Sequence, residues 1–531
     1  MRRWNGWGDE KTKMDLPESA GRFLIQELGH SNTLADISLE EVIAKVPPSR
    51  LKEDALVSLD KEERVRHARG QSLPDWLAMR SGEIGVFPDG VCFPDNRQQV
   101  KDILAYAQKN DIDLIPYGGG TSVAGHINPK QSARATLTVD MRHMNQLMEL
   151  DEESHIATFG AGTPGPMVEA QLRAKGYTLG HFPQSFELST IGGWVASRSS
   201  GQQSLRYGRI EQLFAGGNLE TFEGSLEVPT FPASSAGPDL REILMGSEGR
   251  FGILTEIKVR VSKLADREEF SVIFFPGWRQ ATDFCKHVVQ SRIALSMLRV
   301  SNAVETQTQL KLAGHESSIS WLERYLSLRG CKDKKCMLTF GITGSKEQVK
   351  STKKHIGKFI KQGKGISTGN ILGKKWQQNR FRFPYLREAL WQQGYVVDTL
   401  ETATDWSNVD NLMYKVELGL SQALQEQNEK IHVFTHLSHV YGQGCSLYTT
   451  YLFKNAKDYQ ETLHRWQKLK HRASDIIVNN GGTISHQHGV GKDHAPYLAT
   501  EKGALGMKLL ANISHHFDPE KQLNPGTLLN D

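Results

Sequence analysis

The pattern of apolar and polar residues divides the chain into a charged N-terminal part and a longer part with stronger strand and helix signals. Residues 14–70 contain short helical patterns rich in charge, such as residues 39–43 and 59–65, which are typical of a peripheral helical segment. After this part the pattern changes to a turn and a short strand at residues 87–94. We therefore expect residues 1–86 to form a helical N-terminal extension.

A strand, a helix and a second strand are expected next. Asp95 can cap the helix, and residues 114–116 have the apolar character of a buried strand. One face of the helix is formed by apolar residues at helical spacing, namely Val100, Ile103, Leu104 and Ala107.

The later pattern predicts the rest of this domain and a second domain. Two strands separated by an acidic turn, then a helix and another strand, are expected at residues 137–141, 156–159, 167–175 and 257–261. Further strands are expected at residues 270–275 and 337–342. We predict domains at residues 87–262 and 263–500, and a C-terminal segment at residues 501–531 that returns to the body.

Composition limits the classes of function. The chain has 531 residues, more than one hydrophobic core usually supports, and its 64 Lys and Arg against 60 Asp and Glu give a net charge of +4. This balance argues against nucleic acid as a partner. Five scattered cysteines favour a reducing compartment over a disulfide framework. No secretory signal, bilayer-length apolar run or peroxisomal address is present, so we expect a cytoplasmic protein.

One basic stretch leaves two alternatives open. Residues 346–364 combine an apolar stripe with many lysines. An ordinary helix with a solvated face is one explanation, and peripheral contact with anionic lipid is the other.

Three glycine-rich clusters are the strongest chemical signal. They lie at residues 116–126, 188–201 and 245–255. Backbone N–H groups without Cβ atoms beside them can cradle phosphate oxygens, although a single glycine cluster is as often a simple turn. The first cluster has Val123 where the dinucleotide fingerprint needs its third glycine, and it lacks the ending of a P-loop. The recurrence of such clusters beside strands favours a ligand that is wrapped by backbone.

These clusters resemble the flavin-contacting segments of the vanillyl-alcohol-oxidase (PCMH-type) family of FAD enzymes, over the chain from about Phe87 onward. The matching runs are Pro116-Tyr117-Gly118-Gly119-Gly120-Thr121-Ser122, Ser189-Thr190-Ile191-Gly192-Gly193-Trp194 and Glu248-Gly249-Arg250-Phe251-Gly252-Ile253. Within that family the chain is similar to the alkyl-dihydroxyacetone-phosphate synthases. That similarity rests on Trp4-Asn5-Gly6-Trp7-Gly8, Arg299, Pro384-Tyr385-Leu386-Arg387, Asp398-Thr399-Leu400-Glu401-Thr402, His436-Leu437-Ser438-His439 and Ser485-His486-Gln487-His488-Gly489.

The resemblance implies an α+β fold with a two-subdomain PCMH-type FAD-binding domain, an α+β cap domain and the helical N-terminal extension. It implies non-covalent FAD, because Gly120 occupies the position at which some members carry a histidine that tethers the flavin. The FAD contacts implied are Pro116, Tyr117, Gly118, Gly119, Gly120, Thr121, Ser122, Gln184, Ser189, Thr190, Ser197, Arg198, Ser200, Glu248, Gly249, Gly252 and Ile253.

The resemblance also implies a reaction. The synthases exchange the acyl group of acyl-dihydroxyacetone phosphate for a fatty alcohol in ether lipid synthesis, without net redox change. It assigns acid/base work to Tyr448, catalysis to Arg299, and substrate contacts to Arg387 and Thr399. A phenol needs a lowered pKa to act as a base, and a planar, permanently charged guanidinium suits phosphate. A buried strand tyrosine, surface arginines and a strand threonine are the ordinary alternatives.

The histidine turn departs from the pattern of the synthases. His486 and His488 are implied to be catalytic, but Gln487 stands where the eukaryotic synthases have the middle of three histidines. Glutamine can hydrogen-bond a substrate and cannot take up a proton, which puts ether formation in question. The alternative function is an FAD-linked dehydrogenase or oxidase of a 2-hydroxy acid or a glycerol-phosphate-like substrate. A third alternative is a non-catalytic flavin-binding or lipid-associated protein. It would give no role to the arginines, Tyr448 and the histidines.

No metal site is expected. The sequence after His436 and His439 has no carboxylate nearby, unlike the metal site of the hydroxy-acid enzymes. Spacing alone leaves open a zinc site formed by His436, His439, His486 and His488. The partners expected are a small-molecule or lipid phosphate substrate and no nucleic acid, with a homodimer also left open.

Overall fold

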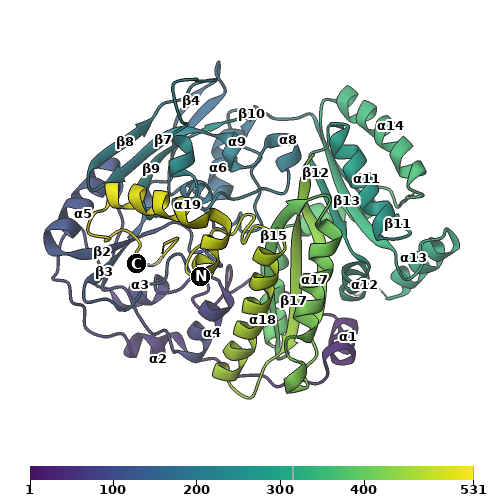
Figure 1. The fold of residues 1–531 in the computed structure, drawn as a ribbon, viewed down its shortest axis with the longest axis horizontal. Coiled ribbons are helices and arrows are strands. Elements are labelled where there is room, and N and C mark those ends of the chain that lie inside the picture. The colour runs from purple at the N-terminus through teal and green to yellow at the C-terminus, as the bar shows by residue number, and fades with distance from the viewer. Residues whose placement is uncertain (314–315, 530–531) are drawn as a thin grey trace.

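A small parallel sheet carries the first glycine loop. The computed structural model describes residues 1–313 and 316–529 (Figure 1). This sheet has the order β1 (Gly90–Cys92), β3 (Ala135–Asp140), β2 (Ile112–Tyr117). Helix α5 (Arg97–Asn110) buries the predicted apolar face, but its N-cap is Asn96, whose side chain accepts from the N–H of Gln99, and not Asp95. Since β2 ends at Tyr117, the glycine loop begins at the end of a buried strand.

An antiparallel sheet completes the first domain. Its order is β4 (Leu147–Asp151), β5 (Ile156–Gly160), β9 (Ile253–Arg260), β7 (Phe214–Thr221), β8 (Gly224–Val228). Strand β4 replaces the expected acidic turn, because an edge strand with mostly exposed side chains lacks an apolar signal. The helices here are α6 (Gly165–Arg173), α7 (Ile191–Ser197), α8 (Ser204–Tyr207), α9 (Ile210–Leu213) and α10 (Arg241–Leu244), with a short strand pair β6 (Tyr177–Thr178) and β10 (Ser262–Lys263).

A seven-stranded sheet forms the second domain, drawn in teal and green in Figure 1. Its order is β14 (Ile366–Ser367), β11 (Arg267–Phe275), β13 (Cys336–Gly344), β12 (Met297–Ser301), β16 (His432–Val440), β17 (Gly444–Lys454), β15 (Tyr395–Asp405). Apolar side chains of this sheet share one core with helices α11 (Trp278–Gln290), α14 (Lys346–Gln362), α17 (Val409–Gln422) and α18 (Tyr459–Asn479). The other helices are α12 (Ala303–Leu312), α13 (Glu316–Leu328), α15 (Ile371–Asn379) and α16 (Phe383–Trp391).

One face of the seven-stranded sheet packs against helices, and the other face lines a cavity. Side chains alternate between faces along a strand, so Tyr451 and Phe453 of β17 enter the helix-covered core. Tyr448, Thr450 and Leu452 of the same strand line a cavity instead. Alternate side chains along β17 therefore either pack in the core or line the candidate site.

The N-terminal segment is not peripheral, contrary to its charge pattern. It contains α1 (Glu18–Leu28), α2 (Leu39–Ala44), α3 (Lys61–Arg66) and α4 (Leu73–Ser81). Leu24 and Leu28 of α1 pack with Phe434 and Leu452 of the seven-stranded sheet. Trp76 of α4 belongs to the main core of that sheet. The charged residues cover the outer faces of helices whose apolar faces are buried.

The C-terminal residues lie against the first domain. Helix α19 (Ala495–Phe517), yellow in Figure 1, precedes a segment in which Leu523 pairs with Leu114 of β2 in a parallel bridge. Leu523 is fully buried, and its carbonyl accepts from Nη1 of Arg250 at 2.8 Å. Among the helices of the described residues, none combines the length and apolar character needed to cross a bilayer.

Candidate active site

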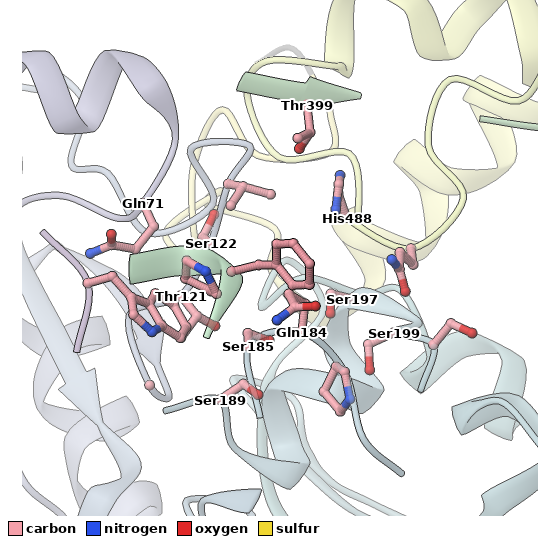
Figure 2. Close-up of a pocket in the computed structure, with 18 of the residues that line it drawn as sticks. Gln71, Thr121, Ser122, Gln184, Ser185, Ser189, Ser197, Ser199, Thr399 and His488 are labelled. Carbon is pink, nitrogen blue, oxygen red and sulfur yellow. The ribbon is translucent and has the colours of Figure 1, made fainter. Parts of the chain in front are cut away.

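A cavity of about 510 Å³ lies between the loops of the first domain and the seven-stranded sheet. Figure 2 shows Ser185, Ser189 and Ser197 on one side of it and Thr399 and His488 on the other. A second part of the lining is apolar and comes from α1, α16 and strands of the sheet, namely Leu24, Leu386, Leu390, Val397, Phe434 and Leu452. The cavity thus joins a polar part to an apolar part.

The first glycine loop is packed so closely that side chains are excluded. A Cβ on Gly119 would lie 1.8 Å from the carbonyl oxygen of Leu188, and one on Gly118 would lie 2.4 Å from Oγ1 of Thr190. Gly120 has a φ of +66°, in the region that glycine adopts without strain. In the described residues, the N–H groups of Gly119, Gly120 and Thr121 donate no hydrogen bond to the protein. Their donors are left for a ligand in the cavity.

The second cluster begins a helix and does not abut a strand as expected. Thr190 is the N-cap of α7, and its Oγ1 accepts from the N–H of Gly193. Arg198 ends the helix in a left-handed conformation, and its guanidinium pairs with Glu242 at 2.8 Å and with Glu211 at 3.6 Å. Arg198 is therefore directed at carboxylates and is absent from the cavity lining, contrary to the expected cofactor contact.

The third cluster links the first domain to the histidine turn. Glu248 adopts a φ of +52°, and its carboxylate accepts from the N–H groups of Val490 and Gly491 at 2.6 and 2.7 Å. His126 Nε2 lies 3.2 Å from the same carboxylate, and His126 Nδ1 lies 2.6 Å from Ser122 Oγ. Glu248 thus connects the first glycine loop to the turn that carries His488.

Arg387 lines the cavity with unused donors. Its Nη1 donates to the carbonyl of Gln71 at 2.7 Å, and its guanidinium lies 4.6 Å from the ring centre of Trp76. Its Nε and Nη2 atoms are buried and have no hydrogen-bond partner among the described residues. Burial lowers the pKa of Arg387, although an arginine stays charged near neutral pH. Such a group has two free donors for an anion.

Arg299 is the second cavity arginine and is already paired. Its Nη2 donates to Glu305 Oε1 at 2.5 Å and lies 3.2 Å from His436 Nδ1. Burial would raise the pKa of Glu305, but His436 and Arg299 lower it to about 2. Glu305 lines the cavity and had no signal in the sequence, because its partners come from β12 and β16.

Tyr448 is not prepared to act as a base in this state. Its hydroxyl donates to Thr399 Oγ1 at 3.1 Å, and its ring stacks on His436 with centroids 4.8 Å apart. Burial raises the pKa of Tyr448 to about 12, whereas a base would need a lowered pKa. The ring of His488 lies edge-on at 6.1 Å, and burial lowers the pKa of His488. The free protein therefore presents a protonated phenol.

The histidine turn is divided between the cavity and the core behind it. Gln487 and His488 line the cavity, but His486, which was expected to be catalytic, does not. His486 is buried, its Nε2 lies 2.7 Å from the Tyr441 hydroxyl, and burial lowers its pKa to about 4. All other residues predicted as catalytic, substrate or cofactor contacts, except Arg198, line the cavity.

A carboxylate does lie near these histidines, which corrects the expectation from sequence. Glu401 Oε1 lies 3.4 Å from His439 Nδ1 and 3.2 Å from His486 Nδ1. Burial would raise the pKa of Glu401, but His486 and His439 hold it well below its usual range. These three buried residues have ligand atoms within 4.8 Å of one another, a spacing that a metal ion can use. The carboxylate also accepts from Ser438 and Gln487, as a hydrogen-bonded cluster does.

Two known protein families match this chain, one in each of its two domains. Residues 88–227 match the family described as "FAD binding domain", and residues 265–528 match "FAD linked oxidases, C-terminal domain". The chain is 30% identical over 498 residues to alkyldihydroxyacetonephosphate synthase of Dictyostelium discoideum, covering 92% of this chain and 80% of that protein. The chain belongs to the FAD-linked oxidase family that contains these synthases.

Two further comparisons extend over nearly the whole chain. The alkyldihydroxyacetonephosphate synthase of Trypanosoma brucei brucei is 27% identical over 573 residues, covering 99% of this chain and 92% of that protein. A solved structure of alkyldihydroxyacetonephosphate synthase superposes with a TM-score of 0.84 at 26% identity, covering 99% of this chain and 98% of that one. The α+β fold with a FAD-binding domain and a second domain is thus confirmed.

FAD is the cofactor of this family, and the polar part of the cavity fits it. The glycine loop offers donors where a Cβ would not fit, as phosphate groups require. Five buried side-chain oxygen atoms of lining residues have no partner among the described residues, namely Ser200 Oγ, Gln202 Oε1, Ser247 Oγ, Glu305 Oε2 and Asn524 Oδ1. Unpaired buried polar atoms are costly, so their presence in the lining indicates a polar ligand.

The N-terminal segment supplies lining residues that sequence reasoning did not assign. Trp7, Phe23, Leu24, Gln71 and Trp76 all line the cavity. The only available signal was the Trp4-Asn5-Gly6-Trp7-Gly8 motif, which supported the family resemblance without indicating a site. Their contribution depends on tertiary packing of α1 and α4 against the second domain.

Proposed function

We propose that the protein is an FAD-dependent alkyldihydroxyacetonephosphate synthase, which exchanges the acyl group of acyl-dihydroxyacetone phosphate for a fatty alcohol. In this exchange the carbon–oxygen bond to the acyl group breaks and a fatty carboxylate leaves with the oxygen. The alcohol oxygen bonds to the same carbon and loses its proton. Bound FAD supplies the electrophilic ring system on which the exchange depends.

The observation that carries this proposal is the composition of one cavity. Two arginines, Arg299 and Arg387, stand in it beside an apolar lining that includes Leu24, Phe434 and Leu452. An anionic head and a long hydrocarbon chain on one molecule match such a lining better than a small 2-hydroxy acid does. The lipid phosphate substrate is therefore favoured over the hydroxy-acid alternative.

In this proposal Arg387 holds the phosphate. Its unpartnered Nε and Nη2 atoms can both donate to one phosphate group, which is the geometry that a guanidinium favours. Arg299 is balanced by Glu305 and serves as the secondary contact. Thr399 and Gln487 contact the substrate from the side of the seven-stranded sheet.

Proton handling falls to Tyr448 and the histidines in this proposal. A phenol with a pKa raised to about 12 holds its proton in the free protein and donates it to an oxygen of the substrate. Removal of a proton from the substrate carbon then depends on a change in the surroundings of Tyr448 on binding, since a neighbouring cation lowers a phenol pKa. His488 faces the ring of Tyr448 from the cavity, whereas His486 acts from behind it.

The cofactor contacts remain a prediction from the family resemblance, without Arg198. We infer that FAD is held non-covalently at the first loop, because Gly120 has no side chain to form a bond. The contacts proposed are Pro116, Tyr117, Gly118, Gly119, Gly120, Thr121, Ser122, Gln184, Ser189, Thr190, Ser197, Ser200, Glu248, Gly249, Gly252 and Ile253. A cytoplasmic location, peripheral membrane contact and a homodimer also stay predictions, as do the domain boundaries.

The test compares exchange with oxidation in the purified FAD-loaded protein. Labelled fatty alcohol added with acyl-dihydroxyacetone phosphate is expected to enter an ether product, and anaerobic addition of acyl-dihydroxyacetone phosphate should perturb the flavin spectrum. Lasting flavin reduction by glycolate, lactate or glycerol phosphate, with no ether formed, would establish the dehydrogenase instead.

A matched pair of variants tests the phosphate contact. Arg387→Met should raise the KM for acyl-dihydroxyacetone phosphate by about 10- to 100-fold, since a hydrogen bond to a charged group contributes about 1.5–3 kcal/mol. Arg279→Met removes an arginine whose side chain is 92% exposed and should leave KM unchanged. Equal KM values for both variants would contradict the role of Arg387.

A further inference from the structure

Gln487 has one end of its amide fixed. Its Nε2 donates to Glu401 Oε2 at 2.5 Å, from the turn between α18 and α19. An amide carries its donor and its acceptor on opposite sides, so Oε1 is directed away from Glu401. Within the described residues, Oε1 of Gln487 accepts no hydrogen bond, and Gln487 lines the cavity. A free carbonyl oxygen is therefore available to a ligand.

Glu401 determines that orientation because it is itself fixed. It lies on β15, is 3% exposed, and its Oε1 faces Ser438, His439 and His486. The opposite amide orientation would place a carbonyl oxygen against an ionised carboxylate. The neighbouring histidines hold the pKa of Glu401 well below its usual range, so the carboxylate is ionised near neutral pH and this repulsion is present there.

The free oxygen lies among the groups assigned to the substrate. Glu401 is paired in register with Tyr448 on β17, and the Tyr448 hydroxyl contacts Thr399. Thr399 and His488 face the cavity in Figure 2. The substrate with a free hydroxyl group in the proposed reaction is the fatty alcohol, and a hydroxyl donates well to a neutral carbonyl oxygen.

We propose that Glu401 is a positioning residue that orients the Gln487 amide, so that Gln487 Oε1 accepts the hydrogen bond of the incoming alcohol. This inference rests on the proposed function. It gives the residue that replaces the middle histidine a role that needs no proton transfer. It also makes recognition of the alcohol independent of the protonation state of that position.

A double-mutant cycle tests whether Glu401 acts through Gln487. Gln487→Met removes the hydrogen-bond acceptor with little change in side-chain length. Glu401→Gln removes the carboxylate that fixes the orientation of the Gln487 amide. Each should raise the KM for the alcohol by about tenfold, the equivalent of one hydrogen bond, while FAD content and the flavin response to acyl-dihydroxyacetone phosphate persist. When Gln487→Met is already present, adding Glu401→Gln should raise the KM for the alcohol by less than about twofold.

Glu417→Gln is the control, because it alters a half-buried carboxylate of α17 that is bound to Asn302 and lies outside the cavity. It should leave the alcohol KM unchanged. An unchanged alcohol KM in Gln487→Met would overturn the inference, as would additive effects in the double variant. Stoichiometric zinc in the wild type that is lost in Glu401→Gln would also overturn it, since Glu401 would then be a ligand. Wild-type protein that forms no ether would instead overturn the proposed function, and the inference with it.

Discussion

At the scale of single residues, His181 shows how burial couples the stability of this protein to pH. It is 1% exposed, its Nε2 lies 2.7 Å from Ser199 Oγ, and its ring packs on Trp194. Burial, assisted by the positive charge of Arg209, lowers its pKa to about 3. In the unfolded chain its pKa returns to about 6.5. Between these two values the unfolded chain binds one more proton than the folded protein.

The free energy of unfolding should therefore fall as pH falls below about 6.5, by at most about 1.4 kcal/mol per pH unit for this residue. His181→Asn keeps a partner for Ser199 and does not titrate. We expect the melting temperature of the wild type to drop more between pH 7.5 and 5.5 than that of the variant. The control is His471→Asn, which alters an exposed histidine of α18 and should keep the wild-type drop. A His181→Asn drop equal to that of the wild type would contradict this role.

At the scale of secondary structure elements, helix α1 joins stability to the shape of the cavity. Leu24 is 1% exposed and lines the cavity, while the adjacent Ile25 is 40% exposed. Leu24→Ala should lower the free energy of unfolding by about 2–4 kcal/mol and enlarge the apolar part of the cavity. Ile25→Ala should change both much less. Melting temperatures and activity across alcohol chain lengths measure the two effects. Similar results for both variants would contradict the role of α1 in stability and in shaping the cavity.

Elements with a regular spacing of apolar residues were predictable from the sequence. Elements and contacts that depend on residues distant in the sequence were not. Helix α5 and strand β11 followed from apolar spacing. Helix α7 did not, because its glycines suggest a turn until Thr190 caps it. Glu401 was missed as a neighbour of His439 and His486 because β15 reaches them only through its pairing with β17. Register between distant strands carries no local signal.

At the scale of the whole molecule, the site depends on segments from both ends of the chain. The N-terminal segment contributes Trp76 to the cavity lining, and the C-terminal segment contributes Asn524. The Asn524 amide donates to the carbonyl of Glu248, whose side chain holds the histidine turn. The glycine loop, the turn and the chain end therefore form one connected structure around the polar part of the cavity.

This arrangement predicts that the C-terminal segment supports cofactor retention from a distance. Leu523 is fully buried against β2, the strand that delivers the glycine loop, and it lies next to Asn524. Leu523→Ala should lower the free energy of unfolding by about 2–5 kcal/mol and weaken FAD retention during gel filtration, because the loop loses its support. Leu505→Ala, at an 80% exposed position of α19, is the control and should change neither quantity. FAD retention that is unaffected in a destabilised Leu523→Ala protein would show that the segment supports the fold without supporting the loop.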